Sequence, residues 1–235
     1  MFFTDSNDKN PKSHSTVGSK KQLSETEIIA NSVFFFVAGF ETTSSTISHC
    51  MYNLAMNPHI QERLFNEVKN AMDKNESSDH YDLVINNIPY LDAVIKETLR
   101  IYPPVSELFR QVGVDNYKIR NFTIEKNTMV IVPTHAIHHC PEYYPNPSKF
   151  DPNRFMPENK HLLVPYTYMP FGQGPRNCVG MRFAYQEIKL CMARLALNYQ
   201  FHVTPKTPQK LTFTPGTPLL RSSDIELRLT KRSSS

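Results

Sequence analysis

The stretch Phe171–Gly180 reads FGQGPRNCVG, and it decides how the rest of the sequence is interpreted. Its glycines and proline predict a tight loop that places Cys178 just before a helix expected over residues 179–197. The amino end of a helix stabilises negative charge, so this position favours a thiolate at Cys178. Arg176, two residues earlier, supplies a cation. The loop therefore predicts a reactive or metal-bound cysteine.

The chemistry of this loop meets the needs of a haem iron held by cysteine. Those needs are a thiolate ligand, backbone N–H groups that donate to its sulfur, and a cation for the carboxylates of the porphyrin. A buried structural cysteine at a helix start is the alternative. His138-His139-Cys140 is a much weaker metal candidate, because neighbouring residues point apart and no second ligand pair has zinc spacing.

A second informative stretch reads AGFETT over residues 38–43, inside a long helix expected from the capping box at Ser24 to Met56. The glycine and threonine in mid-helix predict a local opening of that helix. Glu41 and Thr42 form an acid–alcohol pair of the kind that can relay protons. A kink without chemistry is the alternative.

The third stretch contains Glu97 and Arg100 in a helix expected over residues 90–101. Their spacing puts both charges on one helical face, where they can form an ion pair. Glu107 and Arg110 have the same spacing, so spacing does not by itself select a pair. The amphipathic context and the prolines that follow favour the first pair.

Together these stretches resemble the cytochrome P450 family, the haem–thiolate monooxygenases. The resemblance covers the chain from about Leu23 onward, and residues 38–43 and 166–184 are most similar to the animal microsomal group that oxidises drugs, toxins and steroids. It implies a haem b whose iron is bound by Cys178. It also implies that the chain inserts one oxygen atom of O2 into an apolar small molecule.

The resemblance assigns roles to individual residues. It implies proton delivery on the distal side of the haem by Glu41 and Thr42. The residues that it places against the haem are Arg110, Phe171, Gly172, Arg176 and Cys178. The residues that it places in a buried structural network are Glu97, Arg100 and Arg154. Asn153 replaces an acid that family members usually carry, and residues 105–108 and 217–220 correspond to segments that contact substrate.

The partners implied by the resemblance are O2, NADPH–cytochrome P450 reductase as the source of NADPH-derived electrons, and the apolar substrate. The implied location is the cytosolic face of the endoplasmic reticulum membrane. Family chains are much longer, so we expect this sequence to be a carboxyl-terminal half. The membrane anchor and half of the substrate pocket would then lie in the missing part.

Two alternatives remain open for the function. The first is a truncated, non-enzymatic remnant with weak or no haem binding. The second is a family member that isomerises or dehydrates its substrate without O2. Such relatives tend to lack the acid–alcohol pair, so the presence of Glu41 and Thr42 ranks this alternative last.

Composition narrows the class of protein. The chain has 235 residues, 26 Lys and Arg, 22 Asp and Glu, and a net charge of +4, which is too small to indicate nucleic-acid binding. Its longest apolar run, residues 33–40, is far shorter than the roughly 20 residues that span a bilayer, so we expect no membrane anchor in this chain. Four cysteines without a CxxC pair do not indicate a disulfide scaffold.

The periodicity predicts an α+β fold that is mostly α, and the resemblance implies that this is the C-terminal part of the cytochrome P450 fold. We expect residues 1–22 to be a polar loop and residues 23–235 to form a partial domain. Helices are expected over residues 24–56, 59–73, 90–101 and 179–197. Strands are expected over residues 109–112, 117–119, 122–124 and 129–132, and in a closing pair over 199–203 and 225–229. Residues 75–80 are expected to be a loop, and the proline-rich stretch 141–177 a long functional segment.

Overall fold

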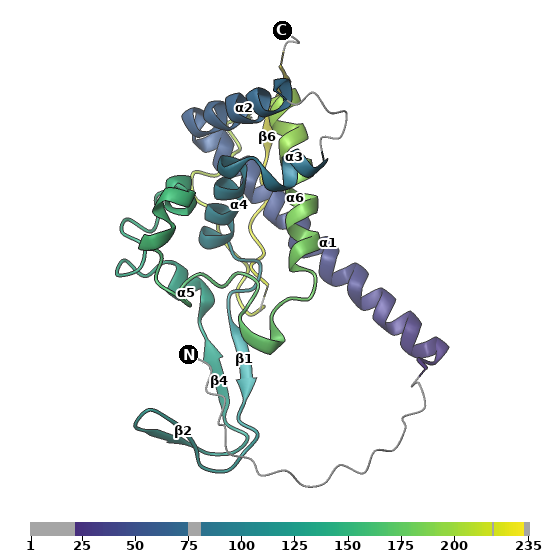
Figure 1. The fold of residues 1–235 in the computed structure, drawn as a ribbon, viewed down its shortest axis with the longest axis vertical. Coiled ribbons are helices and arrows are strands. Elements are labelled where there is room, and N and C mark those ends of the chain that lie inside the picture. The colour runs from purple at the N-terminus through teal and green to yellow at the C-terminus, as the bar shows by residue number, and fades with distance from the viewer. Residues whose placement is uncertain (1–21, 75–80, 218, 233–235) are drawn as a thin grey trace.

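The computed structural model describes residues 22–74, 81–217 and 219–232, and it has the α+β class that the sequence predicts (Figure 1). The described helices are α1 (Glu25–Met56), α2 (Pro58–Asp73), α3 (Tyr81–Asn86), α4 (Pro89–Ile101), α5 (Thr134–His138) and α6 (Met181–Asn198). The described strands are β1 (Leu108–Gln111), β2 (Tyr117–Ile119), β3 (Phe122–Ile124), β4 (Met129–Val132), β5 (Tyr199–Val203) and β6 (Leu227–Lys231). The loop expected over residues 75–80 and almost all of the polar start expected over 1–22 lie outside the described residues.

Local signals begin the long helices where the sequence predicts. The Ser24 hydroxyl accepts from the Glu27 backbone N–H at 3.3 Å, and the Glu27 carboxylate accepts from the Ser24 backbone N–H at 2.8 Å. This capping box satisfies donors that the first turn leaves free. Pro58 and Pro89 stand at the first positions of α2 and α4, where a missing N–H costs nothing.

The short helices and the 3₁₀ turns were not predicted, although the short strands were. The sequence gives no periodic signal over five or six residues, so α3 and α5 are missed. The proline-rich stretch contains 3₁₀ turns over Pro152–Phe155, Pro157–Leu162 and Gly174–Arg176. Each has a proline within its first two residues, which fixes φ and removes an N–H that would have no partner.

The core lies where α1, α2, α4 and α6 meet, and Figure 1 shows these helices gathered on one side of the molecule. Leu54, Leu64, Leu91 and Met192 contribute one side chain from each helix and are fully buried. Burying a leucine-sized side chain contributes about 1.5–3 kcal/mol, so this cluster dominates the stability of the fold.

The two halves of α1 differ sharply in burial. Residues 25–40 are exposed, and this part of the helix extends away from the body in Figure 1. The second half is buried from Thr43 onward against α4 and α6. The predicted opening of the helix is wrong, because α1 runs without interruption. The Thr42 hydroxyl donates to the Ala38 carbonyl at 2.8 Å, and the helix accommodates this bond without breaking.

The described residues form three antiparallel two-stranded sheets: β1 with β4, β2 with β3, and β5 with β6. The second strand of the closing pair begins at Leu227, two residues later than expected. Its register pairs Phe201 with Leu229, and a shift of two keeps every side chain on its expected face.

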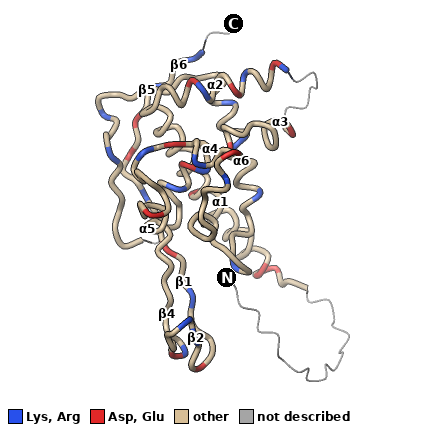
Figure 2. Tube along the Cα trace, turned by 60° about the vertical axis from the view of Figure 1, so that its left-hand side comes forward, with Lys and Arg blue, Asp and Glu red and all other residues tan. Residues whose placement is uncertain are grey.

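Acidic and basic residues are interspersed along the described part of the trace (Figure 2). No helix within the described part of the chain combines the length and apolar character needed to cross a membrane.

Candidate functional site

Backbone hydrogen bonds shape the loop that carries the cysteine. The Cys178 N–H donates to the Phe171 carbonyl at 2.8 Å, which closes the loop just before α6 begins at Met181. Gly172 and Gly174 have φ of +73° and +79°. A side chain at either position would be strained, because left-handed φ values favour glycine. The loop geometry therefore depends on the glycines that the sequence analysis singled out.

The thiol of Cys178 is exposed, as is the guanidinium of Arg176 in the same loop. A Cβ placed on Gly180 would lie 3.9 Å from the Cys178 sulfur, so the sulfur is close to the residue that caps α6. Arg110, on β1, is also exposed and donates only to the neighbouring Phe109 carbonyl among the described residues. An open sulfur with two open cations is a donor set that fits an iron porphyrin and its carboxylates.

The cysteine loop and α1 face each other across a small cavity. Thr42 of α1 and Phe171 of the loop line this cavity of about 20 Å³, together with Leu99 and Ala184. The Phe171 ring packs against Tyr185 of α6, with 5.0 Å between ring centroids. The structure therefore brings two of the predicted site segments together, although they lie more than a hundred residues apart.

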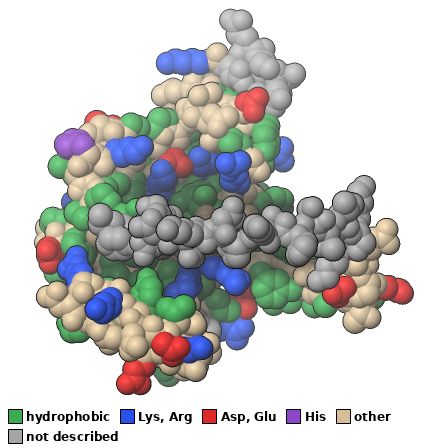
Figure 3. Space-filling model, turned by 60° about the horizontal axis from the view of Figure 1, so that its bottom comes forward, with side chains coloured by type: hydrophobic (Ala, Val, Ile, Leu, Met, Phe, Trp, Pro, Cys, Tyr) green, Lys and Arg blue, Asp and Glu red, His purple; other side chains and the backbone are tan. Residues whose placement is uncertain are grey.

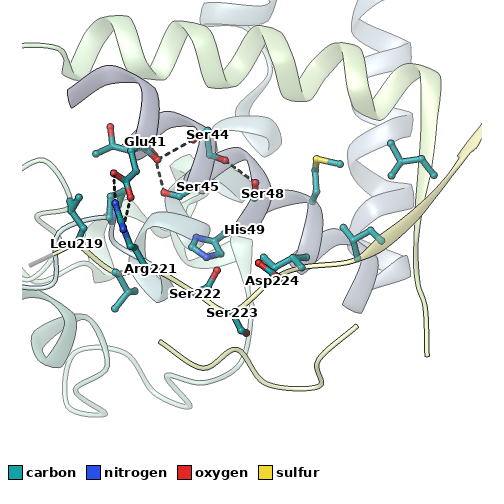
Figure 4. A pocket seen from close by; sticks show the side chains of 17 residues that line it. Glu41, Ser44, Ser45, Ser48, His49, Leu219, Arg221, Ser222, Ser223 and Asp224 are labelled. Atoms are coloured by element: carbon teal, nitrogen blue, oxygen red, sulfur yellow. Dashed lines mark hydrogen bonds and ion pairs between the residues drawn. The ribbon is translucent and has the colours of Figure 1, made fainter. Parts of the chain in front are cut away.

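The predicted acid–alcohol pair is adjacent but not joined by a hydrogen bond among those described. Glu41 instead accepts two hydrogen bonds from Arg221, at 2.6 and 3.1 Å (Figure 4). The hydrogen bonds from Arg221 lower the pKa of the Glu41 carboxyl. Sequence reasoning missed Arg221, because 180 residues separate it from Glu41 and no spacing rule connects them.

A cavity of about 520 Å³ extends from Glu41 along α1 to the segment before β6 (Figure 4). His49 lines it and is 2% exposed, and neither of its ring nitrogens has a hydrogen-bond partner among the described residues. The Ser223 hydroxyl lines it too and is likewise buried without a partner there. Burial lowers the pKa of His49 to about 4, so the ring is neutral at physiological pH. No motif or spacing in the sequence pointed to either residue.

The two segments expected to contact substrate lie side by side. Val105 forms an antiparallel bridge with Leu219, and the Leu220 N–H donates to the Pro104 carbonyl at 2.9 Å. Glu107, an unexpected charge in the first segment, is exposed. The structure thus joins residues that the sequence analysis could place in one pocket only through the resemblance.

The three residues expected in a structural network lie in contact, with Glu97 and Arg100 fully buried and Arg154 partly exposed. The Arg100 guanidinium donates to both oxygens of Glu97, at 2.7 and 2.8 Å, and both side chains are 0% exposed. Arg154 approaches the same carboxylate, with 3.4 Å between its Nε and Glu97 Oε1. Burial raises the pKa of the Glu97 carboxyl, and its hydrogen bonds with Arg100 oppose that rise. Glu97, Arg100 and Arg154 therefore form one ion network.

The departure at Asn153 is accommodated beside this network. The Asn153 side chain accepts from Arg63 at 2.8 Å and donates to Asp151 at 3.0 Å. Both ring nitrogens of His138 form hydrogen bonds with backbone groups, so this residue has no lone pair to offer a metal. Within the described ranges, no group of three His, Cys, Asp or Glu side chains could hold a metal ion.

The underside of the molecule carries both apolar and basic side chains. Figure 3 shows hydrophobic side chains on this face, with Lys and Arg side chains among them. The exposed part of α1 supplies much apolar surface, including Phe34, Phe36 and Phe40, which are 67–75% exposed. Exposed apolar surface of this kind marks a face that interacts with a ligand or with another protein segment.

Comparison with known proteins gives the same reading. A model of the cytochrome P450 family matches residues 5–228. The chain is 42% identical over 215 residues to Probable cytochrome P450 6a13 of Drosophila melanogaster, which covers 90% of this chain and 43% of the relative. It is 39% identical over 232 residues to Cytochrome P450 3A17 of Cavia porcellus, covering 99% and 44%. It is 40% identical over 210 residues to Cytochrome P450 9e2 of Blattella germanica, covering 88% and 39%. The chain therefore spans about two-fifths of the length of these curated relatives.

Proposed function

Because this chain belongs to the cytochrome P450 family, we propose that it is the haem-binding, carboxyl-terminal part of a haem-dependent monooxygenase. The single observation that carries the proposal is Cys178, an exposed thiol in a glycine-shaped loop at the start of α6. In this proposal residues 23–235 are part of a larger domain, and Cys178 is the axial ligand of a haem b iron.

The residues present fit the haem in charge and in shape. The Cys178 thiol would bind the iron as a thiolate, because a metal-bound cysteine is deprotonated. Arg110 and Arg176 would pair with the carboxylates, and both guanidinium groups are open to do so. Phe171, held by its ring contact with Tyr185, would exclude water beside the sulfur. When bound, the haem supplies the iron chemistry that activates O2.

The proposed role of Glu41 and Thr42 is proton delivery. Because hydrogen bonds from Arg221 lower the pKa of Glu41, its carboxylate is ionised at neutral pH and acts as a proton acceptor. The Thr42 hydroxyl donates its proton in a hydrogen bond to the Ala38 carbonyl. Proton delivery therefore requires this hydroxyl to rotate away from the helix backbone. Glu41 would take up a proton from water and pass it on to replace the one that Thr42 gives up.

The remaining partners follow from the relatives and the chemistry. We infer an apolar small-molecule substrate, contacted by residues 105–108 and 217–220, which the Val105–Leu219 bridge holds together. Electrons would come from NADPH through NADPH–cytochrome P450 reductase. The location would be the cytosolic face of the endoplasmic reticulum membrane.

A second candidate is a chain that binds haem weakly and has no activity. It is favoured by the exposure of Cys178 and of residues 25–40 of α1, since solvent access to a haem weakens its hold. Absorption spectra of the purified chain with added haem separate the two candidates. A stable thiolate-type spectrum supports the monooxygenase part, and its absence supports the inactive chain.

The ligand assignment is tested by replacing Cys178 with Ala and recording the reduced, carbon-monoxide-bound spectrum of the haem-loaded protein. We expect the thiolate-type Soret band to disappear in Cys178→Ala and to persist in Cys191→Ala. Cys191 is a suitable control because it is another free cysteine, half-buried in α6. An unchanged band in Cys178→Ala would refute the assignment.

The proton-delivery role is tested by Thr42→Ala in the active protein. We expect a larger share of the NADPH electrons to appear as hydrogen peroxide and a smaller share as product. Thr43→Ala is the neighbouring control, since Thr43 is buried beside Thr42. Full coupling of electron use to product in Thr42→Ala would remove the role.

A further inference from the structure

His138, at the end of α5, is a fully buried histidine that the proposed mechanism does not use. Its Nε2 lies 3.0 Å from the backbone nitrogen of Met169, and its Nδ1 lies 3.1 Å from the carbonyl oxygen of Arg100. A backbone N–H can only donate, so Nε2 must be the acceptor nitrogen. The ring proton therefore resides on Nδ1, which donates a hydrogen bond to the backbone carbonyl of Arg100. Both partners together specify one neutral tautomer.

The bond to Met169 leads directly into the cysteine loop. The Met169 carbonyl accepts from the Gly172 N–H at 3.0 Å, and the Phe171 carbonyl accepts from the Cys178 N–H at 2.8 Å. These bonds fold residues 169–178 onto themselves. The imidazole of His138 is thus a bridge between the carboxyl-terminal end of α4 and the base of the loop that carries the thiol.

The bridge is held rigidly at its α4 end. The Arg100 guanidinium donates to the backbone carbonyl of His138 at 2.8 Å, while the His138 ring donates to the backbone carbonyl of Arg100. The two residues therefore bond each other in both directions. The ring also stacks on Tyr168, with 5.6 Å between centroids and 18° between planes. Packing and hydrogen bonds leave this ring one orientation.

We propose that His138 is a positioning residue for the Cys178 loop. Its neutral Nδ1–H imidazole sets the place of Met169 relative to α4, and through Met169 the place of the loop that presents the thiol. This inference deepens the proposed function, because it gives a haem-ligand loop its support. The hydrogen bonds that carry it do not depend on haem being bound.

Two amide substitutions distinguish the hydrogen bond of His138 with Arg100 from its hydrogen bond with Met169. In His138→Asn the short side chain can donate near the former Nδ1 position and cannot reach Met169. In His138→Gln the longer side chain carries its amide oxygen to the former Nε2 position, where it can accept from Met169. His139→Ala is the matched control. It is the neighbouring histidine and is half-buried; among the described residues its ring forms a hydrogen bond only with the His135 carbonyl, and it stacks on the His135 ring.

The test is amide hydrogen exchange of the chain without haem, read at Met169 and Gly172. We expect His138→Asn to speed exchange at these two amides by about tenfold or more, because Met169 loses its acceptor. His138→Gln should restore most of the protection, and His139→Ala should leave it unchanged. Equal losses in Asn and Gln, or a loss spread evenly over the core helices, would mean that His138 merely fills space and would overturn the proposal.

Two further measurements keep this inference separate from the proposed function. Nitrogen-15 spectra of the wild-type chain should show His138 protonated on Nδ1, and an Nε2-protonated ring would contradict the bridge. In the haem-loaded protein, His138→Asn should weaken the thiolate-type Soret band and His138→Gln should retain it. If the wild-type chain has no such band while the exchange pattern holds, the haem proposal fails and the positioning role of His138 stands.

Discussion

The ion network around Glu97 and the loop around Cys178 differ in burial and in the groups that hold them in place. Glu97 and Arg100 are fully buried, and each charged group has hydrogen-bond partners. Cys178 is exposed, and backbone bonds rather than its side chain hold its loop. A buried ion pair that loses one partner leaves an uncompensated charge, whereas an exposed thiol has no such dependence. Stability and proposed chemistry therefore reside in different residues.

The largest expected effect comes from breaking the network. Arg100→Ala leaves the Glu97 carboxylate buried without its bidentate partner, and we expect a loss of about 3–5 kcal/mol in unfolding free energy. Denaturant unfolding followed by circular dichroism measures it. Lys126→Ala is the control, because its exposed pair with Asp115, at 3.9 Å, is worth about 0–1 kcal/mol. A loss below about 1 kcal/mol in Arg100→Ala would contradict the comparison.

The next largest effect should come from acid, which lowers the free energy of unfolding through the buried His49. Burial lowers the pKa of His49 to about 4, from an ordinary value of 6.5. The unfolded chain therefore takes up the proton first as pH falls, so this stabilisation is present above pH 6.5 and is lost as pH falls through 4. The loss is on the order of 3 kcal/mol for this residue.

The measurement is the denaturant midpoint of wild type and His49→Phe between pH 7.5 and pH 4. Phenylalanine suits the site because the ring lies against Tyr102 and Phe213. We expect the denaturant midpoint of His49→Phe to depend less on pH than that of the wild type. Identical slopes in the two proteins would show that His49 titrates normally in the folded state.

On the exposed side, Cys178→Ser should leave unfolding nearly unchanged. We expect a shift within about 0.5 kcal/mol, since the thiol is exposed and makes none of the loop's backbone bonds. The paired variant is Cys50→Ser. The Cys50 side chain is fully buried, and burial raises the pKa of its thiol to about 12. A hydroxyl there should cost about 1–3 kcal/mol. Similar losses of unfolding free energy in both variants would contradict the difference in burial between the two cysteines.

The smallest effect on stability is expected at the exposed ion pair beside α1. Removing the guanidinium in Arg221→Gln should raise the pKa of Glu41 toward its ordinary value, because hydrogen bonds from Arg221 hold it down. A carbon-13 titration of the Glu41 carboxyl measures this change. The unfolding midpoint should stay in place, since both groups are open to solvent. An unmoved Glu41 titration would show that the pair is not formed in solution.

Much of this molecule was predictable because it depends on neighbours in the chain. The Ser24 capping box and the prolines at 58 and 89 act within one helical turn, so the starts of α1, α2 and α4 follow from spacing. The pairing of Glu97 with Arg100 is also local, at i and i+3. The predicted opening near Thr42 was wrong because the rest of α1 holds the helix straight through that bond.

What the sequence determined by itself is the four long helices, the glycine-shaped cysteine loop and the family that they indicate, since each depends on residues within a few positions of one another. Only the tertiary structure decided that Arg221 meets Glu41, that His138 bridges Arg100 and Met169, and that one half of α1 is buried while the other is exposed. The physical reason is that these contacts depend on the path of the whole chain. Hydrogen-bond partners and burial at such separations are set by packing, and no local spacing encodes them.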